Sequence, residues 1–161
     1  MKASEEYPVI QRILIGSRAH GLARPDSDYD YREVFYIPTR ELIQVPVSAR
    51  PKMAWSAENK HTDDEAGWEI AALLEMIMRG HPNAVEVMFA PVEEQTDDGE
   101  SLRELRPHLL ASGKFIASTL GYAQNCRNKL IAKNQVERDL KWKVTYLRVL
   151  YQGLEIGRAH V

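Results

Sequence analysis

Two aspartates at the start of a predicted strand are the residues best suited to chemistry in this sequence. Asp28 and Asp30 are two positions apart, so on a strand both would point to one face, about 6–7 Å from each other. Two such carboxylates are costly to ionise together unless a cation lies between them, and Mg²⁺ prefers oxygen ligands. Gly16 and Ser17 precede them by a ten-residue spacer; Gly16 permits close backbone approach, and Ser17 offers a hydroxyl and an N–H to a phosphate. The spacing predicts a site for a divalent cation and a phosphate group.

The elements that must position these residues are predicted to be strands early in the chain. The apolar run over residues 9–15 predicts a buried strand, and the aromatic and β-branched run over 28–37 predicts a second one. Residues 16–27 have the glycine, proline and polar residues of a loop, and 52–56 predict a further short strand. We therefore expect a mixed sheet of about three to five strands within residues 9–60.

Helices are predicted from Asp64 onward, where the apolar period changes. Apolar residues recur at helical spacing from Ile70 to Met78, and Gly80 with Pro82 ends that helix. An acidic loop is expected over residues 93–99. Later helices are predicted over 84–89, capped by Asn83; over 102–110, with Ser101 and Glu104 as a capping box; over 114–132; and over 136–154. Strands followed by helices indicate the α+β class.

Composition is that of a soluble globular protein. The chain has 161 residues, of which 44% are hydrophobic and 27% charged, and no apolar run reaches the roughly 18 residues of a membrane span. Its single cysteine, Cys126, excludes an internal disulfide framework, and we expect it to be buried in a helix. The N-terminus has no apolar signal region, so we expect a cytoplasmic protein that does not enter a membrane.

Charge is unevenly distributed along the chain. Residues 1–113 contain 12 Lys and Arg against 20 Asp and Glu, whereas residues 114–161 contain 9 against 3. An acidic part could hold metal ions and a basic part could face phosphates, although solvated helix surfaces explain the same asymmetry.

Three segments resemble a known family. The string GSRAHGLARPDSDYDYR, residues 16–32, resembles the signature of the DNA polymerase beta-like nucleotidyltransferase superfamily, and in particular its predicted nucleotidyltransferase branch associated with RNA repair. Residues 68–91 and 146–156 are similar to two further motifs of that branch. The sequence departs from the branch at His20, His81 and Tyr146, and the last departure puts a catalytic role at that position in doubt.

This resemblance implies a nucleotidyltransferase fold and a magnesium-dependent reaction. The enzyme would move a nucleoside monophosphate from a nucleoside triphosphate to an acceptor hydroxyl, with an RNA 3′ end as the acceptor that the branch suggests. A protein hydroxyl, as in the minimal nucleotidyltransferase antitoxins, is the alternative acceptor. A catalytically inactive module that binds a nucleotide or a partner is the alternative outside enzymes.

The resemblance also assigns roles to residues. Asp28 and Asp30 would be catalytic metal ligands, and Gly16, Ser17 and Arg18 would bind the nucleotide phosphates. A third carboxylate is required, and Asp64 best matches its offset before the amphipathic helix. The other candidates for that carboxylate are Asp63, Glu65 and Glu69, of which Glu69 would lie inside the helix. The alternative is that Asp63, Asp64 and Glu65 are acids at a helix N-terminus, stabilised by the helix dipole.

We expect a catalytic domain over residues 1–113 and a helical C-terminal portion over 114–161. The last six residues, IGRAHV, equal one reading frame of a widely used sequencing adapter, ATCGGAAGAGCACACGTC. The branch's proteins are commonly longer, so we expect the C-terminal portion to be truncated.

Overall fold

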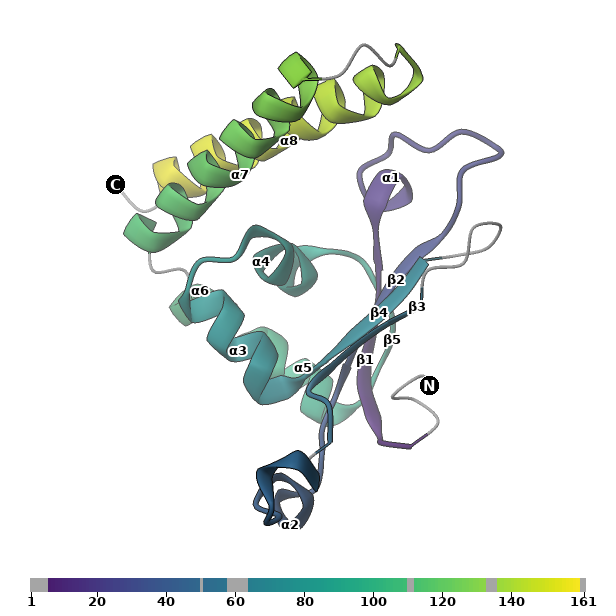
Figure 1. The fold of residues 1–161 in the computed structure, drawn as a ribbon, viewed down its shortest axis with the longest axis vertical. Helices are drawn as coiled ribbons and strands as arrows, with labels where there is room; N and C mark the ends of the chain where they lie inside the picture. Colours follow the sequence, from purple (N-terminus) through teal and green to yellow (C-terminus); the bar gives the residue numbers. More distant parts are fainter. Residues whose placement is uncertain (1–5, 50, 58–63, 110–111, 133–135, 160–161) are drawn as a thin grey trace. The chain divides into compact units, whose positions relative to one another are not determined.

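The computed structural model describes residues 6–49, 51–57, 64–109, 112–132 and 136–159, and it contains one mixed five-stranded sheet (Figure 1). The strands are β1 (Val9–Ile15), β2 (Asp30–Phe35), β3 (Ala54–Ala57), β4 (Asp64–Glu69) and β5 (Val92–Gln95). They are ordered β3-β4-β2-β1-β5, with β2 and β4 parallel and the other neighbours antiparallel. The predicted α+β class with a mixed sheet is confirmed.

The sheet extends further along the chain than the sequence indicated. The strands predicted near residues 9–15, 28–37 and 52–56 are present, but β4 and β5 lie beyond residue 60, where a helix start and an acidic loop were expected. The confinement of the sheet to residues 9–60 was therefore wrong. Residues 64–69 form a strand because β2 and β3 both offer it backbone partners, which local sequence cannot reveal.

The helices differ from the prediction mainly at their starts. They are α1 (Gly16–Ala19), α2 (Thr39–Leu42), α3 (Ile70–Met78), α4 (Pro82–Phe89), α5 (Asp97–Glu104), α6 (Arg106–Leu109), α7 (Ser112–Ala132) and α8 (Val136–Ala159), with a 3₁₀ turn at Val47–Ala49. Asn83 lies inside α4 rather than capping it. The capping box predicted at Ser101 is also wrong, because α5 begins at Asp97 and the Thr96 hydroxyl accepts from the backbone N–H of Gly99.

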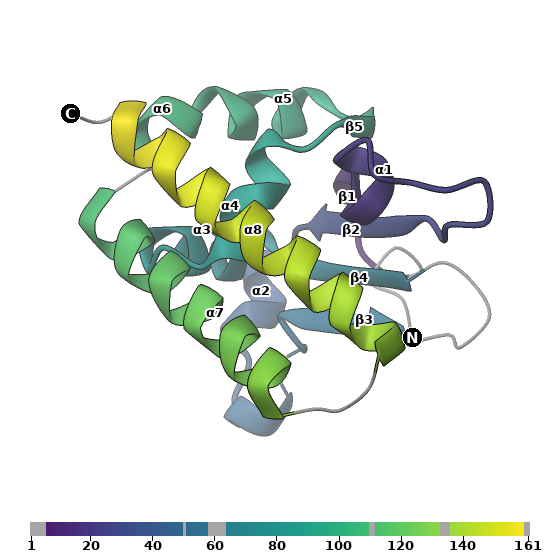
Figure 2. The ribbon, with the colours of Figure 1, turned by 90° about the horizontal axis from the view of Figure 1, so that it is seen from above.

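The chain forms two compact units. The first comprises Met1–Glu75 with Glu86–Pro107 and holds the sheet; the second comprises Met76–Val85 with His108–Val161. In the second unit α7 and α8 lie side by side (Figure 2). Cys126 is buried there, as predicted, together with Phe115 and Val149. No helix in the described ranges is long and apolar enough to cross a membrane.

Strand alternation divides the sheet of the first unit into two chemically different faces. Asp30, Arg32 and Val34 share one face of β2, and Tyr31 and Glu33 share the other. Beyond Tyr31 and Glu33, Phe35 forms a small apolar core with Ile37, against which Trp55 packs. Asp30 and Asp64 are the first residues of β2 and β4, so they lie at the end of the sheet where β1 finishes.

Candidate active site

The parallel register of β2 and β4 sets two of the predicted aspartates side by side. Asp30 and Asp64 are Cα partners in this pairing, and each is the first residue of its strand. Parallel neighbours in register point to the same face of a sheet, about 4.8 Å apart between strands. The register therefore brings Asp64, the preferred third carboxylate, next to Asp30.

Gly16 leaves room for the Asp30 carboxylate. Gly16 follows β1 with a φ of +72°, and its neighbour Ile15 is the Cα partner of Asp30. A methyl group added at Gly16 would overlap Asp30 Oδ2 and lie 2.9 Å from Asp30 Cγ. Glycine is needed here both for the positive φ and for the close approach of the carboxylate to the backbone. Ser17 lies in the first turn of α1, directly after this contact.

The segment that leads into the aspartates is held by Arg18. Its Nε and Nη2 donate to the Ser27 carbonyl oxygen at 3.2 and 2.6 Å, and its guanidinium lies 3.8 Å from the ring centre of Tyr29. Asp28 lies between these two contacts, exposed and just before β2 begins. The structure therefore gives Arg18 a role in ordering the approach to Asp28 that sequence reasoning, which saw only a phosphate ligand, did not foresee.

Two residues that the sequence did not single out as site residues add charge on the Asp30 face. Arg32 Nη1 donates to the carbonyl oxygens of Tyr31 at 2.7 Å and Asp64 at 3.4 Å. Burial lowers the pKa of Arg32, while the charges of Asp30, Asp64 and Glu86 raise it, so the guanidinium lies within electrostatic reach of all three carboxylates. Sequence periodicity could not have identified the contact with Asp64, because Arg32 and Asp64 are 32 positions apart in the chain.

Glu86 is in turn paired with a residue of the loop after α1. Its Oε1 lies 2.7 Å from His20 Nε2, and both side chains are largely buried. His20 is one of the positions at which the sequence departs from the branch it resembles, and the structure gives the substitution a partner on α4.

The other candidates for a third carboxylate have different roles. Glu65 lies on β4 but on the opposite face, where its Oε1 accepts from Arg12 Nη2 at 2.8 Å. Glu69 was expected inside the helix, and this is wrong: it is the last residue of β4. Its carboxylate caps α3 by accepting a hydrogen bond from the backbone N–H of Ala71 at 2.7 Å. Asp63 lies outside the described residues. The alternative that Asp64 and Glu65 begin a helix is wrong, since both belong to a strand.

The donor set fits a divalent cation in its chemistry. Asp30 and Asp64 offer neighbouring carboxylates, the ligands that Mg²⁺ prefers, and Gly16 leaves space beside one of them. Within the described part of the chain, no three or more His, Cys, Asp or Glu side chains are grouped so that they could hold a metal ion. Asp28 is exposed and lies two positions before Asp30.

The sequence and the structure were compared with those of known proteins. A search of curated proteins finds no match. Among solved structures, a nucleotidyltransferase-like protein from Exiguobacterium sibiricum aligns with a TM-score of 0.41 and 12% identity, over 98% of this chain and 54% of that one. This chain thus spans about half the length of that protein. The sequence matches the family described as the RNA repair pathway DNA polymerase beta family over residues 1–161, and the chain belongs to that family.

Proposed function

We propose that this protein is a magnesium-dependent nucleotidyltransferase that moves a nucleoside monophosphate from a nucleoside triphosphate to an acceptor hydroxyl, with an RNA 3′ end as the acceptor. The observation that carries the proposal is the pairing of Asp30 with Asp64 across β2 and β4, with Gly16 against the Asp30 carboxylate. Membership of an RNA repair family supports the choice of acceptor.

In this proposal Asp28, Asp30 and Asp64 hold the cation. A bound divalent cation would neutralise charge on the triphosphate and lower the pKa of the acceptor hydroxyl. The Asp30 and Asp64 carboxylates repel each other without a cation, which favours binding of the metal with its triphosphate. Arg32, whose charge acts on the same two carboxylates, limits that repulsion in the free protein.

The phosphates would lie at the end of β1. Ser17 and the backbone at Gly16 would donate to them, and Arg18 would contribute Nη1 while Nε and Nη2 stay on Ser27. This arrangement directs the α-phosphate toward the carboxylates and leaves the acceptor to approach from the exposed side of Asp28.

The test is pyrophosphate release from each labelled triphosphate, with and without RNA, in wild type and four single variants. Asp28→Asn, Asp30→Asn and Asp64→Asn should each lower turnover by about 100-fold or more, because each removes a ligand charge. Asp26→Asn is the matched control, since Asp26 is an exposed aspartate two residues before Asp28. It should leave turnover unchanged.

Three outcomes of this test separate the readings. RNA-dependent release supports the proposal, and label found on protein alone indicates the protein-modifying alternative. Magnesium-dependent triphosphate binding without pyrophosphate release for any acceptor indicates a binding module. Equal turnover in wild type and in a folded Asp30→Asn and Asp64→Asn double variant refutes the assignment of the site.

A further inference from the structure

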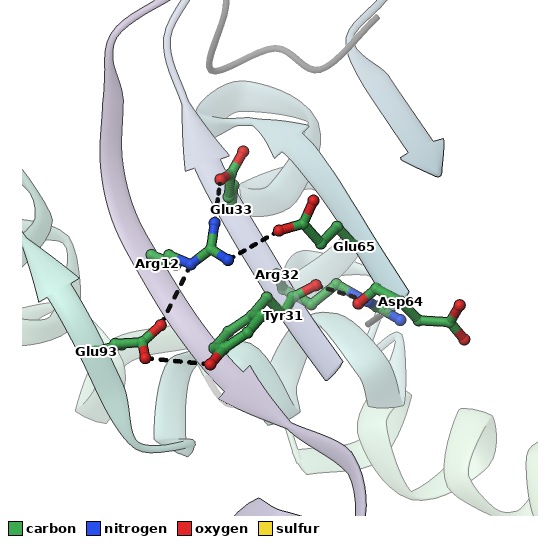
Figure 3. Close-up of polar contacts among 7 residues, drawn as sticks. All are labelled: Arg12, Tyr31, Arg32, Glu33, Asp64, Glu65 and Glu93. Atoms are coloured by element: carbon green, nitrogen blue, oxygen red, sulfur yellow. Dashed lines mark hydrogen bonds and ion pairs between the residues drawn. The ribbon is translucent and has the colours of Figure 1, made fainter. Parts of the chain in front are cut away.

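A single arginine ties together four strands on the face of the sheet opposite the aspartates (Figure 3). Arg12 of β1 lies 2.9 Å from Glu33 of β2, 2.8 Å from Glu65 of β4 and 3.2 Å from Glu93 of β5. Each of its nitrogens serves a different carboxylate, and the guanidinium lies 4.2 Å from the ring centre of Tyr31. We call Arg12, Glu33, Glu65 and Glu93 the arginine hub.

The hub depends on features of the sheet that orient its carboxylates. Glu93 is the extra residue of a register shift between β1 and β5, where Arg12 pairs with Glu94 and Ile13 with Val92. Such a bulge turns a side chain that would otherwise point elsewhere toward its partner. The Glu93 carboxylate also accepts from the Tyr31 hydroxyl at 3.1 Å.

Burial makes the hub a firm connection. The Glu33 side chain is 4% exposed and the Glu65 side chain 11%, whereas that of Glu93 is 44% exposed. Burial alone would lower the pKa of Arg12, but its hydrogen bonds and ion pairs with these glutamates raise it above its usual value. A guanidinium offers fixed donors in one plane, so it fixes the relative positions of the carboxylates it holds.

The contact with Glu65 is the one closest to the candidate site. Glu65 is the neighbour of Asp64, and in the described part of the chain it is the Cα partner of both Tyr31 on β2 and Ala57 on β3. Arg32 also holds the Asp64 backbone, through a long contact of 3.4 Å. The hydrogen bond from Arg12 to Glu65, at 2.8 Å, is thus a short side-chain restraint next to Asp64.

Two tyrosines that alternate with Asp28 and Asp30 along the chain connect this segment to the arginine hub. Tyr29 and Tyr31 stack with ring centres 6.0 Å apart, Arg18 lies over Tyr29, and Arg12 lies over Tyr31. Asp28 and Asp30 alternate with these tyrosines along the chain, so the stack supports the strand from behind.

We propose that Arg12 is a positioning residue that, through Glu65, holds the start of β4 in the register that keeps Asp64 beside Asp30. The inference rests on the proposed function, in which Asp30 and Asp64 bind the divalent cation. Supporting residues behind metal ligands commonly change metal affinity by about 10-fold or more when they are lost. Arg12 touches neither the cation nor the substrate in this role.

The test measures Mn²⁺ binding, by the loss of the free-ion signal in electron paramagnetic resonance, in three glutamate variants. Glu65→Met removes the acceptor of the Arg12 hydrogen bond and should weaken binding about 10-fold or more. Glu65→Gln loses the same charge but keeps an acceptor oxygen, and should remain within about threefold of wild type. Glu93→Met is the matched control on β5. It should also bind Mn²⁺ like wild type, because it leaves the hydrogen bond between Arg12 and Glu65 on β4 intact.

A variant at the other end of the hydrogen bond tests the inference independently, in case Glu65→Met does not fold. Arg12→Lys keeps the positive charge near Glu33 but has one nitrogen for three carboxylates, so it should also weaken Mn²⁺ binding. Amide hydrogen exchange, which needs no metal, should accelerate at the start of β4 in Arg12→Lys and Glu65→Met but not in Glu93→Met.

Each result decides the inference. Weak binding in Glu65→Gln equal to that in Glu65→Met would make the effect one of charge and overturn positioning. Wild-type binding in the folded Glu65→Met and Arg12→Lys variants would overturn it as well. If Asp30→Asn binds Mn²⁺ like wild type, the proposed function itself fails and the inference with it, and this result is distinct from the other two.

Discussion

The contact between Gly16 and Asp30 predicts a loss of both stability and metal binding in Gly16→Ala. Gly16 and Gly21 have nearly the same positive φ, +72° and +68°, but an added methyl would overlap Asp30 Oδ2 at Gly16 and meet nothing within 4 Å at Gly21. Gly21→Ala is therefore a control with the same backbone strain and no collision.

The magnitude follows from these two geometries. A left-handed conformation costs a non-glycine residue about 1–2 kcal/mol, and alanine recovers about 0.4–1 kcal/mol through the unfolded chain. Gly21→Ala should therefore lower the free energy of unfolding by about 1 kcal/mol. Gly16→Ala must in addition displace the Asp30 carboxylate, and overpacking of this kind adds about 1–3 kcal/mol.

The assay combines urea unfolding, followed by circular dichroism, with Mn²⁺ binding. Gly16→Ala should be the less stable variant and should bind Mn²⁺ about 10-fold or more weakly, whereas Gly21→Ala should bind like wild type. In an Asp30→Ala background the collision with the carboxylate is gone and only the contact with Cβ at 3.2 Å remains, so the stability cost of Gly16→Ala in excess of Gly21→Ala should shrink. Equal stability and equal metal affinity of the two glycine variants in the wild-type background would refute the reasoning.

Three further predictions concern the first unit. Gly67→Ala should lower the free energy of unfolding by about 1–3 kcal/mol, because the new methyl would overlap Trp55 Nε1 and lie 3.0 Å from Trp55 Cε2; a neutral effect in urea unfolding contradicts this. Glu69→Ala should cost about 0.5–2 kcal/mol by uncapping α3, and Glu69→Gln, which keeps an acceptor, should cost less in the same measurement. Burial and the hydrogen bond to Glu41 raise the pKa of Tyr7 to about 12, so an ultraviolet titration should show a late-ionising tyrosine signal that Tyr7→Phe removes. Unfolded tyrosine ionises near pH 10, so wild type should lose stability relative to Tyr7→Phe as the pH rises from about 10 to 12, and parallel stability curves would exclude the contact.

The parts of the site that are local in sequence could be predicted, and those that depend on strand pairing could not. Gly16 and the Asp28–Asp30 pair are recognisable because their spacing and residue types are themselves the signal. Asp64 was selected by its offset from a helix, yet its neighbour in space is set by a parallel pairing with β2, 34 positions earlier in the chain.

The strand β4 was misread for a physical reason. Residues 64–69 read DEAGWE, with little β-branched content, and the apolar helix pattern begins immediately at Ile70. The strand is favoured by its two neighbours rather than by local propensity, since β2 and β3 both supply backbone hydrogen bonds. Glu69 was accordingly assigned to the helix that it in fact caps.

The arginine hub has no signature in the sequence. Glu33, Glu65 and Glu93 are spaced by about thirty residues and belong to three strands, so only the sheet order brings them to Arg12. The periodicity of apolar residues identifies which residues share one face of a helix, but it does not show whether that face is buried. Leu147 and Tyr151 are apolar residues four positions apart in the helix predicted over 136–154, a spacing typical of a buried face, but each is 65% exposed.

The place of β1 in the sheet has a consequence for synthesis on the ribosome. β1 lies between β2 and β5, and the Gln11 side chain contacts that of Gln95, 84 residues later. Because synthesis proceeds at about 5–20 residues per second, roughly 4–17 s pass between synthesis of β1 and synthesis of β5, its partner on the outer edge. During that interval the apolar segment VIQRILI presents open backbone groups, and its one charge, Arg12, has no Glu93 to hold. In the nascent chain the same arginine would act first as a gatekeeper against strand-to-strand association, before it joins the sheet.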